Sequence, residues 1–270
     1  MITKTATLKI EGGRRVRCLT TESKDGLPSI SIITAVYNGN ATIEAAIKSV
    51  LSQDYPDFEY IVIDGGSADG TIDTLKKYDE FIDYWASEPD NGVYDALNKG
   101  VDHARGEWIY FLGADDRLAD DNVLRRFLSN VPASKMVYGS VRWESSGKIY
   151  DGEFSRWKLF FHNISQQAIF YHRDLFRAIG KFELKYPILS DWLFNMRAYA
   201  EKDTNPFFID SVVAVYSEKG MSTVRADVMF YRDHPKIIRN TFGFPSYLRF
   251  RIYLLFKALV SHLKKAVRME

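Results

Sequence analysis

The amino-acid sequence predicts an α/β fold built on a mainly parallel sheet with helices on both faces. Between residue 29 and about residue 130, short runs rich in branched apolar residues alternate with segments whose apolar residues recur at helical spacing. Turn-forming residues such as glycine, asparagine and aspartate close these runs. Strands that alternate with helices need crossover connections, and such connections place neighbouring strands in parallel.

The elements of this alternating region follow one another in a regular order. The run from 29 to 36 is typical of a buried strand, and in the helix after it Ile43, Ile47 and Val50 share one face. Ligands of parallel sheets bind at the carboxyl ends of the strands, so the loops that follow the strands should converge on one crevice. We predict strands at 29–36, 58–63, 82–87 and 108–112, and helices at 43–53, 71–78, 92–104 and 120–128.

Beyond about residue 135 the alternation is less regular. No repeat or long linker marks a boundary, so residues 29–220 are predicted to form one domain with two halves, 29–130 and 131–220. Residues 1–28 are an extension that adds a strand or forms a loose basic arm, and residues 221–270 are a helical tail. In the second half we predict strands at 136–143, 168–171 and 207–216 and helices at 173–179 and 190–200.

The composition is that of a soluble globular protein. A formal net charge of +1, with 46% hydrophobic and 26% charged residues in 270, excludes disordered and disulfide-stapled chains. The lone Cys18 cannot pair within the chain, which favours a reducing compartment and a cytoplasmic protein. We expect neither a signal peptide nor a membrane span, because no apolar run is long enough for the latter.

The charge is divided unevenly along the chain. Residues 225–270 carry 10 basic and 3 acidic residues, or +7, whereas residues 1–224 carry 26 and 32, or −6. The acidic body argues against nucleic acid as a partner. The tail has an apolar stripe with basic residues beside it, so residues 245–270 could lie on an anionic membrane or could pack the stripe on the domain. The stripe consists of Leu248, Ile252, Leu255, Leu259, Leu263 and Ala266.

Two adjacent carboxylates, Asp115 and Asp116, follow the apolar strand that ends at Leu112. Adjacent carboxylates repel each other, and a divalent cation would relieve that repulsion. Their hard oxygen ligands suit Mn²⁺ or Mg²⁺, which can in turn bridge a diphosphate. The alternative is that both residues only solvate the loop before the next helix.

The loop 64–71 begins with Asp64 at the end of the second strand. This carboxylate could accept a hydrogen bond from a ligand, or Ser67 and Asp69 could simply cap a tight turn. The loop lacks both the dinucleotide glycine fingerprint and the lysine of a phosphate loop, which argues against an oxidoreductase and a nucleoside triphosphatase. In the segment 88–100, Asp95 and Lys99 share a helix face, either as an exposed ion pair or as groups facing a diphosphate.

Four collinear segments resemble a family 2 glycosyltransferase, and more narrowly the bacterial subgroup that builds O-antigen, capsule and exopolysaccharide. They lie at residues 31–38, 62–71, 87–100 and 111–116. The resemblance covers residues 29 to about 220. It implies a GT-A fold with a Rossmann-like sheet, a UDP- or GDP-sugar donor, Mn²⁺ or Mg²⁺, and inversion at the anomeric carbon.

The resemblance also assigns residues to the donor and the metal. The donor would be bound by Thr34, Val36, Tyr37, Asp64, Asp95, Lys99 and Ala114. Asp115 matches the last carboxylate of the family's Asp-x-Asp motif and would hold the metal, with Asp116 beside it. One departure is clear, because Gly113 stands where the motif has its first aspartate.

The second half supplies the acceptor side. By the same resemblance, Asp191 is the general base that removes the acceptor's proton, although Ser190 replaces the glutamate that often precedes it. By residues alone, Asp191 is only a carboxylate at a helix N-terminus. The acceptor side would also include Gln166, Gln167, His172 and Trp192, with His172 open to a structural role as well.

The expected function is therefore inverting, metal-dependent transfer of a sugar to a lipid-linked oligosaccharide in surface polysaccharide synthesis, at the cytoplasmic face of a membrane. The alternative is a non-catalytic member of the same fold that binds sugar nucleotides or acts as a scaffold. Gly113 and Ser190 motivate that alternative.

Overall fold

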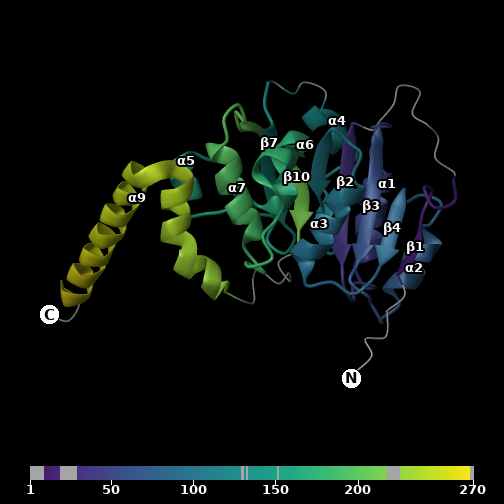
Figure 1. Ribbon diagram of the computed structural model, residues 1–270, viewed down its shortest axis with the longest axis horizontal. Helices are drawn as coiled ribbons and strands as arrows, with labels where there is room; N and C mark the ends of the chain where they lie inside the picture. Colours follow the sequence, from purple (N-terminus) through teal and green to yellow (C-terminus); the bar gives the residue numbers. More distant parts are fainter. Residues whose placement is uncertain are drawn as a thin grey trace.

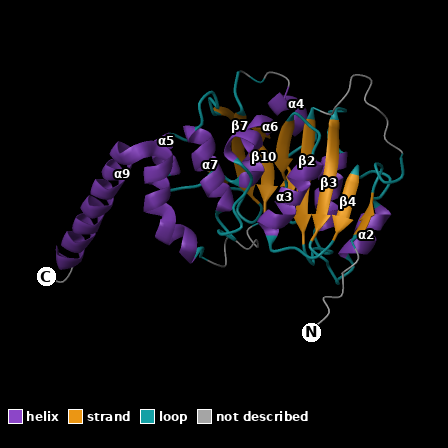
Figure 2. Ribbon diagram, in the orientation of Figure 1, coloured by secondary structure: helices purple, strands orange, loops and turns teal. Residues whose placement is uncertain are grey.

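The computed structural model describes residues 9–18, 29–128, 131, 133–150, 152–217 and 226–267. In this part of the chain a ten-stranded sheet forms the centre, helices cover both of its faces, and one long helix projects from one end (Figures 1 and 2). The α/β class predicted from the sequence is confirmed. The projecting helix gives the molecule an elongated outline.

The elements agree closely with those predicted. The strands are β1 (Ile10–Gly12), β2 (Ile30–Val36), β3 (Phe58–Asp64), β4 (Tyr84–Ser87), β5 (Trp108–Phe111), β6 (Arg117–Leu118), β7 (Met136–Trp143), β8 (Ile149–Tyr150), β9 (Ile169–His172) and β10 (Phe207–Tyr216). The helices are α1 (Ile43–Leu51), α2 (Thr71–Lys77), α3 (Val93–His103), α4 (Val123–Leu128), α5 (Arg156–Leu159), α6 (Arg173–Ile179), α7 (Ser190–Ala200) and α9 (Val228–Val267), with the 3-10 turn η1 (Gln166–Ala168).

The order of the strands positions the crevice. β4, β3, β2 and β5 are adjacent and parallel, and the pairs Val36–Asp64 and Asp64–Ser87 bring three strand ends side by side. β9 is antiparallel to both β5 and β7, so β7 and its parallel neighbour β10 end at the same edge of the sheet as β5. The loops that follow these strands therefore meet there, as predicted.

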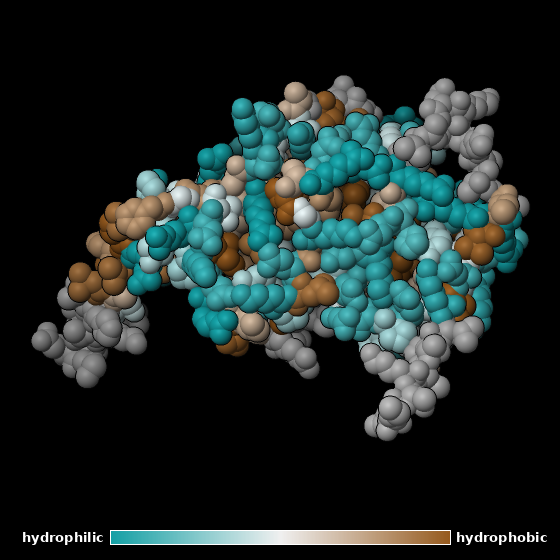
Figure 3. Space-filling view, in the orientation of Figure 1, coloured by the Kyte–Doolittle hydropathy of each residue, from teal (hydrophilic) through white to brown (hydrophobic). Residues whose placement is uncertain are grey.

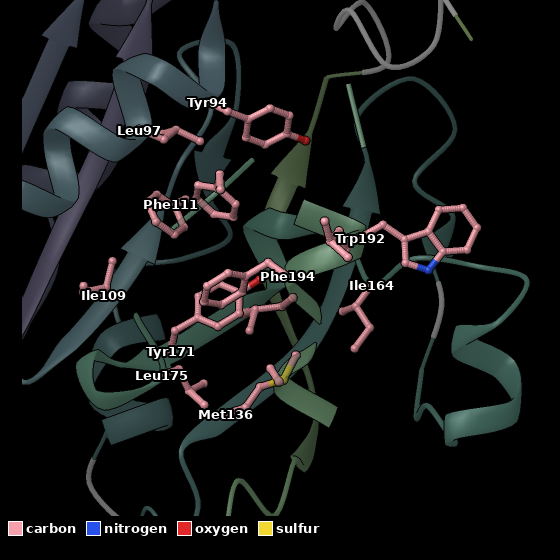
Figure 4. Packing of buried hydrophobic residues seen from close by; sticks show 14 of the residues in the cluster. Tyr94, Leu97, Ile109, Phe111, Met136, Ile164, Tyr171, Leu175, Trp192 and Phe194 are labelled. Atoms are coloured by element: carbon pink, nitrogen blue, oxygen red, sulfur yellow. The ribbon is translucent and has the colours of Figure 1, made fainter. Parts of the chain in front are cut away.

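The core has two layers, because successive residues of each strand face opposite sides of the sheet. On β2, Ile30 and Ile32 pack with α1 and α4, whereas Ile33 joins the aromatic-rich layer on the other face. Figure 4 shows this second layer, where Tyr94 from α3 and Trp192 from α7 belong to one cluster. The same layer takes in the first half of α9 through Phe230 and other residues.

The segment before residue 29 adds a strand to the sheet. β1 pairs antiparallel with β4, and Arg15, just after it, forms a buried ion pair with Glu59 at the opposite end of β3 from the crevice. The sequence left two alternatives for residues 1–28, an added strand or a loose arm, and residues 10–12 form an added strand. Residues 1–8 and 19–28 lie outside the described residues.

Helix α9 is broken at Gly243, whose φ of +83° is left-handed, and Pro245 follows the break. The first half packs on α7, and the second half, the arm (residues 244–261), extends away from the domain (Figure 1). Phe250 is buried at the root of the arm, packed on Phe160 and Phe161.

The apolar stripe of the arm faces solvent. Ile252 and Leu255 are 57% and 66% exposed, and Figure 3 shows hydrophobic side chains along the arm. For Leu248, Ile252, Leu255 and Leu259 the structure thus contradicts packing of the stripe on the domain. The side chains of Leu263 and Ala266 lie outside the described residues. No helix among the described residues is long and apolar enough to cross a membrane.

Candidate active site

Asp64 lies beneath the crevice and organises the loop above it. It is fully buried, and its carboxylate accepts hydrogen bonds from the backbone N–H of Gly66 and Ser67 at 3.1 and 2.9 Å. The hydroxyls of Ser87, at 2.6 Å, and Ser67 donate to it as well. Asp64 therefore shapes the turn, and because its side chain has no exposed surface, the structure does not present it to a ligand.

Of the predicted donor-binding residues Thr34, Val36 and Tyr37, only Tyr37 is exposed, with 66% of its surface open. Thr34 is buried and accepts a hydrogen bond from the Tyr60 hydroxyl at 3.1 Å, and Val36 is also buried. Both side chains point into the core layer under α1 and α4, which corrects the prediction that they bind the donor. The backbone at Val36 still ends the strand at the crevice.

The sequence did not single out Asp90, yet Asp90 forms a wall of the crevice beside Tyr37. A Cβ atom placed on Gly65 would lie 2.6 Å from Asp90 Oδ2 and 3.3 Å from the Tyr37 ring. Gly65 therefore allows these two side chains to close on the backbone. Burial raises the pKa of the Asp90 carboxyl above its usual value.

The helix after β4 brings Asp95 and Lys99 to the same rim. Asp95 accepts hydrogen bonds from the backbone and side chain of Asn91 at 2.9 and 3.2 Å. Lys99 Nζ lies 3.9 Å from Asp95 but 3.0 Å from Glu88, which is its closer partner. Lys99 is thus a cation held at the rim by carboxylates of its own loop.

The acidic pair follows β5. Asp116 is buried, with Oδ1 accepting from the Ser217 N–H at 2.8 Å and Oδ2 accepting from Gln167 Nε2 at 2.5 Å. Burial, and then the neighbouring charge of Asp115, raises the pKa of Asp116 to about 7. Burial also raises the pKa of Asp115, which remains partly open.

These two carboxylates fit a divalent cation. A bound cation would offset the free-energy cost of burying their negative charges and would reduce the repulsion between them. Asp116 is committed to Gln167 and Ser217, so Asp115 is the better-placed ligand. No group of three or more histidine, cysteine or acidic residues gathers among the described residues. Waters or oxygens of a bound diphosphate would therefore have to complete the coordination.

The structure gives a steric reason for the glycine at position 113. A Cβ atom at this position would collide with Asp116 Oδ2 and approach Asp115 Oδ1 to 3.2 Å. The carboxylate of Asp116 thus fills the space that a side chain at 113 would need. Ala114, which we predicted to contact the donor, lies partly buried near Gly39.

Asp191 sits in the first turn of α7 and is 8% exposed. The Tyr94 hydroxyl donates to its Oδ1 at 2.7 Å, and Asn163 Nδ2 donates to its Oδ2 at 2.6 Å. Burial raises the pKa of Asp191 to about 6, against which these donors act. Tyr94 belongs to the segment 87–100 that carried the resemblance, but the sequence pattern did not assign it a role.

One segment joins the acidic pair to Asp191. Asn163 donates to Asp191 and Gln167 donates to Asp116, so the residues 163–167 span both groups. Gln166, between them, has a buried Nε2 with no hydrogen-bond partner. The predicted base and the predicted metal-ligand pair are therefore both held by one five-residue segment.

Two predicted acceptor-side residues lie elsewhere. His172 pairs with Trp108 at the start of β5, the opposite end of the sheet from the crevice, and its Nε2 is 3.2 Å from Glu107 Oε1. Trp192 is buried, donates to the Leu159 carbonyl at 2.8 Å and stacks on Phe230. Both assignments are corrected. Antiparallel β9 carries His172 away from the crevice, and the α7 turn points Trp192 into the core.

Comparison of the chain with known proteins identifies its family. The model of glycosyl transferase family 2 matches residues 31–178, more than half of the chain. The chain belongs to glycosyl transferase family 2. It is a glycosyltransferase, and its sheet and helices form the GT-A fold.

Relatives of this glycosyltransferase are named for PGL/p-HBAD biosynthesis and for teichuronic acid biosynthesis. It is 38% identical over 222 residues to the PGL/p-HBAD biosynthesis glycosyltransferase of Mycobacterium tuberculosis, covering 78% of this chain and 86% of that one. Over 99 residues, 36% of this chain and 39% of the relative, it is 38% identical to the putative teichuronic acid biosynthesis glycosyltransferase TuaG of Bacillus subtilis.

Solved structures share the fold. A fragment of S. aureus TarS in complex with UDP superposes with a TM-score of 0.65 at 20% identity, covering 79% of this chain and 66% of the fragment. The chain thus spans about two thirds of that fragment's length. The mannosyltransferase PcManGT of Pyrobaculum calidifontis, in complex with GDP-Man and Mn²⁺, gives 0.59 at 19% identity, covering 78% of this chain and 64% of that one.

Proposed function

We propose that this glycosyltransferase moves a sugar from a nucleoside diphosphate to a hydroxyl of a lipid-linked oligosaccharide, with inversion, in the synthesis of a surface polysaccharide. The observation that carries the proposal is that one short segment, residues 163–167, hydrogen-bonds to both Asp191 and Asp116 of the acidic pair. An inverting transfer needs a base on one side of the sugar and a stabilised diphosphate on the other.

Each carboxylate has one role in this scheme. Asp191, with a pKa of about 6, is ionised at neutral pH and accepts the proton of the attacking hydroxyl. Asp115, with Asp116 behind it, would hold Mn²⁺ or Mg²⁺, and the bound cation would neutralise charge on the leaving diphosphate. Lys99 lies at the same rim and can exchange Glu88 for a phosphate oxygen.

The donor is a UDP- or GDP-sugar in this proposal. Tyr37, exposed beside Gly65 and Asp90, is the aromatic surface on which a nucleobase would rest. The two kinds of donor are those named for the TarS and PcManGT structures. A thermal-shift comparison of UDP, GDP and their sugars, each with Mn²⁺, decides between them.

We also propose that the arm holds the enzyme on the inner face of the cytoplasmic membrane, where a lipid-linked acceptor would lie. Its apolar stripe, including Ile252 and Leu255, faces away from the domain, while Phe250 on the opposite side anchors it. Arg249 and Arg251 flank the stripe, and the tail from residue 225 carries +7. Such a helix suits the headgroup region of an anionic bilayer.

The test of the enzymatic proposal is Mn²⁺-dependent hydrolysis of UDP-GlcNAc and GDP-mannose by the purified protein. Turnover that requires Asp191 and Asp115 supports catalysis. Donor binding without turnover, also with a broad panel of acceptors, would favour the non-catalytic alternative. Gly113, one of the two departures behind that alternative, also has a steric explanation, because a side chain there would collide with Asp116.

A further inference from the structure

A chain of hydrogen bonds surrounds the carboxylate of Asp191. Tyr94 on α3 donates to Oδ1 at 2.7 Å, and Asn163 donates to Oδ2 at 2.6 Å. Behind Asn163, Asn195 Nδ2 donates to the Asn163 carbonyl oxygen at 2.8 Å, and the Tyr171 hydroxyl donates to Asn195 Oδ1 at 2.7 Å. The buried Tyr171 and Asn195 thereby orient the Asn163 amide with its N–H toward Asp191.

Tyr94 differs from Asn163 because it has a second acceptor. Its hydroxyl lies 2.7 Å from the Ile188 carbonyl oxygen as well as 2.7 Å from Asp191 Oδ1. A phenol has one hydrogen, so only one of these bonds can be donated at a time. The ring is buried, with its centroid 5.2 Å from that of Phe182, so rotation about the phenol C–O bond is the motion that exchanges the two acceptors.

This arrangement satisfies both protonation states of Asp191. When the carboxylate is ionised, Tyr94 donates to Oδ1. When Oδ1 carries a proton, that proton is donated to the Tyr94 oxygen, and Tyr94 donates to Ile188. Oδ2 has no such freedom, because the Asn163 N–H that faces it can only donate. The Asp191 carboxyl and the Tyr94 hydroxyl thus keep a hydrogen-bond partner in both states, which avoids a penalty of about 1–3 kcal/mol for leaving either of them unpaired. The Ile188 carbonyl gives up the Tyr94 bond while Asp191 is ionised.

We propose that Tyr94 is a positioning residue of the transfer reaction, holding the Asp191 carboxylate before the transfer and turning to Ile188 as Oδ1 receives the acceptor's proton. The proposal rests on the role of Asp191 as the base. In the step, the acceptor O–H bond breaks and its proton moves to Asp191 Oδ1. The acceptor oxygen bonds to the anomeric carbon, and the carbon–oxygen bond to the diphosphate breaks with its electron pair on the diphosphate.

Of the described residues besides Tyr94 and Asn163, only the backbone N–H groups of Trp192 and Asp191 itself lower the pKa of the Asp191 carboxyl through hydrogen bonds. The titratable neighbours are phenols, Tyr94 from α3 and Tyr171 from β9, and burial followed by the Asp191 charge raises the pKa of both well above 10. Asp227, just before α9, accepts from the Ile188 and Leu189 N–H groups at 3.1 and 3.2 Å instead. Both phenols therefore remain neutral donors at working pH.

The experiment is a carbon-13 NMR titration of the Asp191 carboxyl in the full, substrate-free chain, with the signal assigned by its disappearance in Asp191→Asn. Tyr94→Phe keeps the ring and removes one donor to the ionised form, so the pKa of Asp191 should rise by about one pH unit. Asn163→Ala should raise it similarly. Tyr199→Phe removes a buried bond to the Tyr138 hydroxyl, remote from Asp191, and should leave the pKa unchanged.

The activity readout must agree. In Mn²⁺-dependent hydrolysis of UDP-GlcNAc or GDP-mannose, kcat should decrease at low pH with a midpoint that shifts together with the Asp191 pKa measured by NMR. The KM for the donor should stay the same. An unchanged Asp191 pKa in Tyr94→Phe, or in Asn163→Ala should the first variant not fold, overturns the inference. Full hydrolysis by Asp191→Asn overturns the proposed base instead, and the NMR titration then still decides the hydrogen-bond network.

Discussion

The Tyr94 hydroxyl on α3 lies 2.7 Å from Asp191 Oδ1 on α7, although 97 residues separate the two in the chain. Tyr94 follows β4, in the half of the domain that carries the predicted donor loops. Asp191 belongs to the predicted second half, residues 131–220. The contact therefore joins the two halves at the crevice and sets the position of the carboxylate relative to the donor side.

Replacing Asp191 with asparagine should abolish transfer and leave donor binding intact. The amide keeps the shape of the carboxyl group but cannot take a proton from the acceptor. We expect turnover to fall by roughly 10²- to 10⁴-fold, as is usual for loss of a general base. Steady-state kinetics measures the decrease, and the Mn²⁺-dependent thermal shift with UDP or GDP serves as the control. Wild-type turnover would remove Asp191 from the mechanism.

The same variant should be more stable than the wild type at pH 8. The pKa of Asp191 is raised from 3.8 to about 6 on folding, so its contribution to stability is full below pH 4 and is lost as the pH rises through 6. Ionised Asp191 then costs the folded protein up to about 3 kcal/mol.

Urea unfolding from pH 5 to pH 8 measures this effect. The free energy of unfolding of Asp191→Asn should exceed that of the wild type at pH 8, and the difference should shrink toward pH 5. Asparagine can still accept from Asn163 and donate to Tyr94, which can turn to Ile188. A difference that does not vary with pH contradicts the raised pKa.

A side chain at position 113 should be tolerated only when Asp116 is shortened. Gly113→Ala brings Cβ onto Asp116 Oδ2, so we expect a destabilisation of roughly 1–3 kcal/mol, the usual cost of overpacking. In an Asp116→Ser background the added methyl group should cost much less. A double-mutant cycle of unfolding free energies measures the coupling, and additive effects would show that Asp116 does not occupy that space.

Asp115 should control the response to metal. Asp115→Ala removes the partly open carboxylate of the pair, so the extra thermal stabilisation that Mn²⁺ adds to UDP or GDP should disappear. Asp73→Ala is the matched control, because Asp73 is 84% exposed on α2 and remote from the pair. A Mn²⁺-dependent shift that persists in Asp115→Ala would place the cation elsewhere.

The stripe of the arm should determine membrane binding. Leu255→Asp puts a charge in the centre of the stripe, where an apolar side chain would otherwise be buried among the lipids. Co-sedimentation with vesicles containing phosphatidylglycerol should therefore fall by about tenfold or more. Ser261→Asp introduces the same charge on the opposite side of the helix and should have a smaller effect. Equal binding by both variants would mean that charge alone attracts the tail.

The sequence predicted the long elements well and missed the short ones. The strands at 136–143 and 207–216 and the helices at 173–179 and 190–200 agree with β7, β10, α6 and α7. The strands β6 and β8 have two residues each, too few to show a periodic pattern. The break in α9 at Gly243 could have been foreseen from Gly243 and Pro245 together.

For the site, the sequence located carboxylates but could not tell which way side chains face. Thr34 and Val36 lie in the right strand, yet their side chains enter the core, and only Tyr37 beyond the strand end is open. His172 is close to Gln167 in sequence, but antiparallel β9 carries it to the far end of the sheet. A local motif does not contain the direction of a strand that pairs with a distant one.

Apolar periodicity, turn residues and four spaced motifs are local properties, so the chain itself was enough to indicate the α/β fold, the family and the positions of Asp115 and Asp191. Contacts between distant segments depend on packing. Folding alone brought Tyr94 and Asn163 to the two oxygens of Asp191 and placed Asp116 in the space beside Gly113. Burial at these contacts, rather than residue type, sets the protonation of the carboxyl groups.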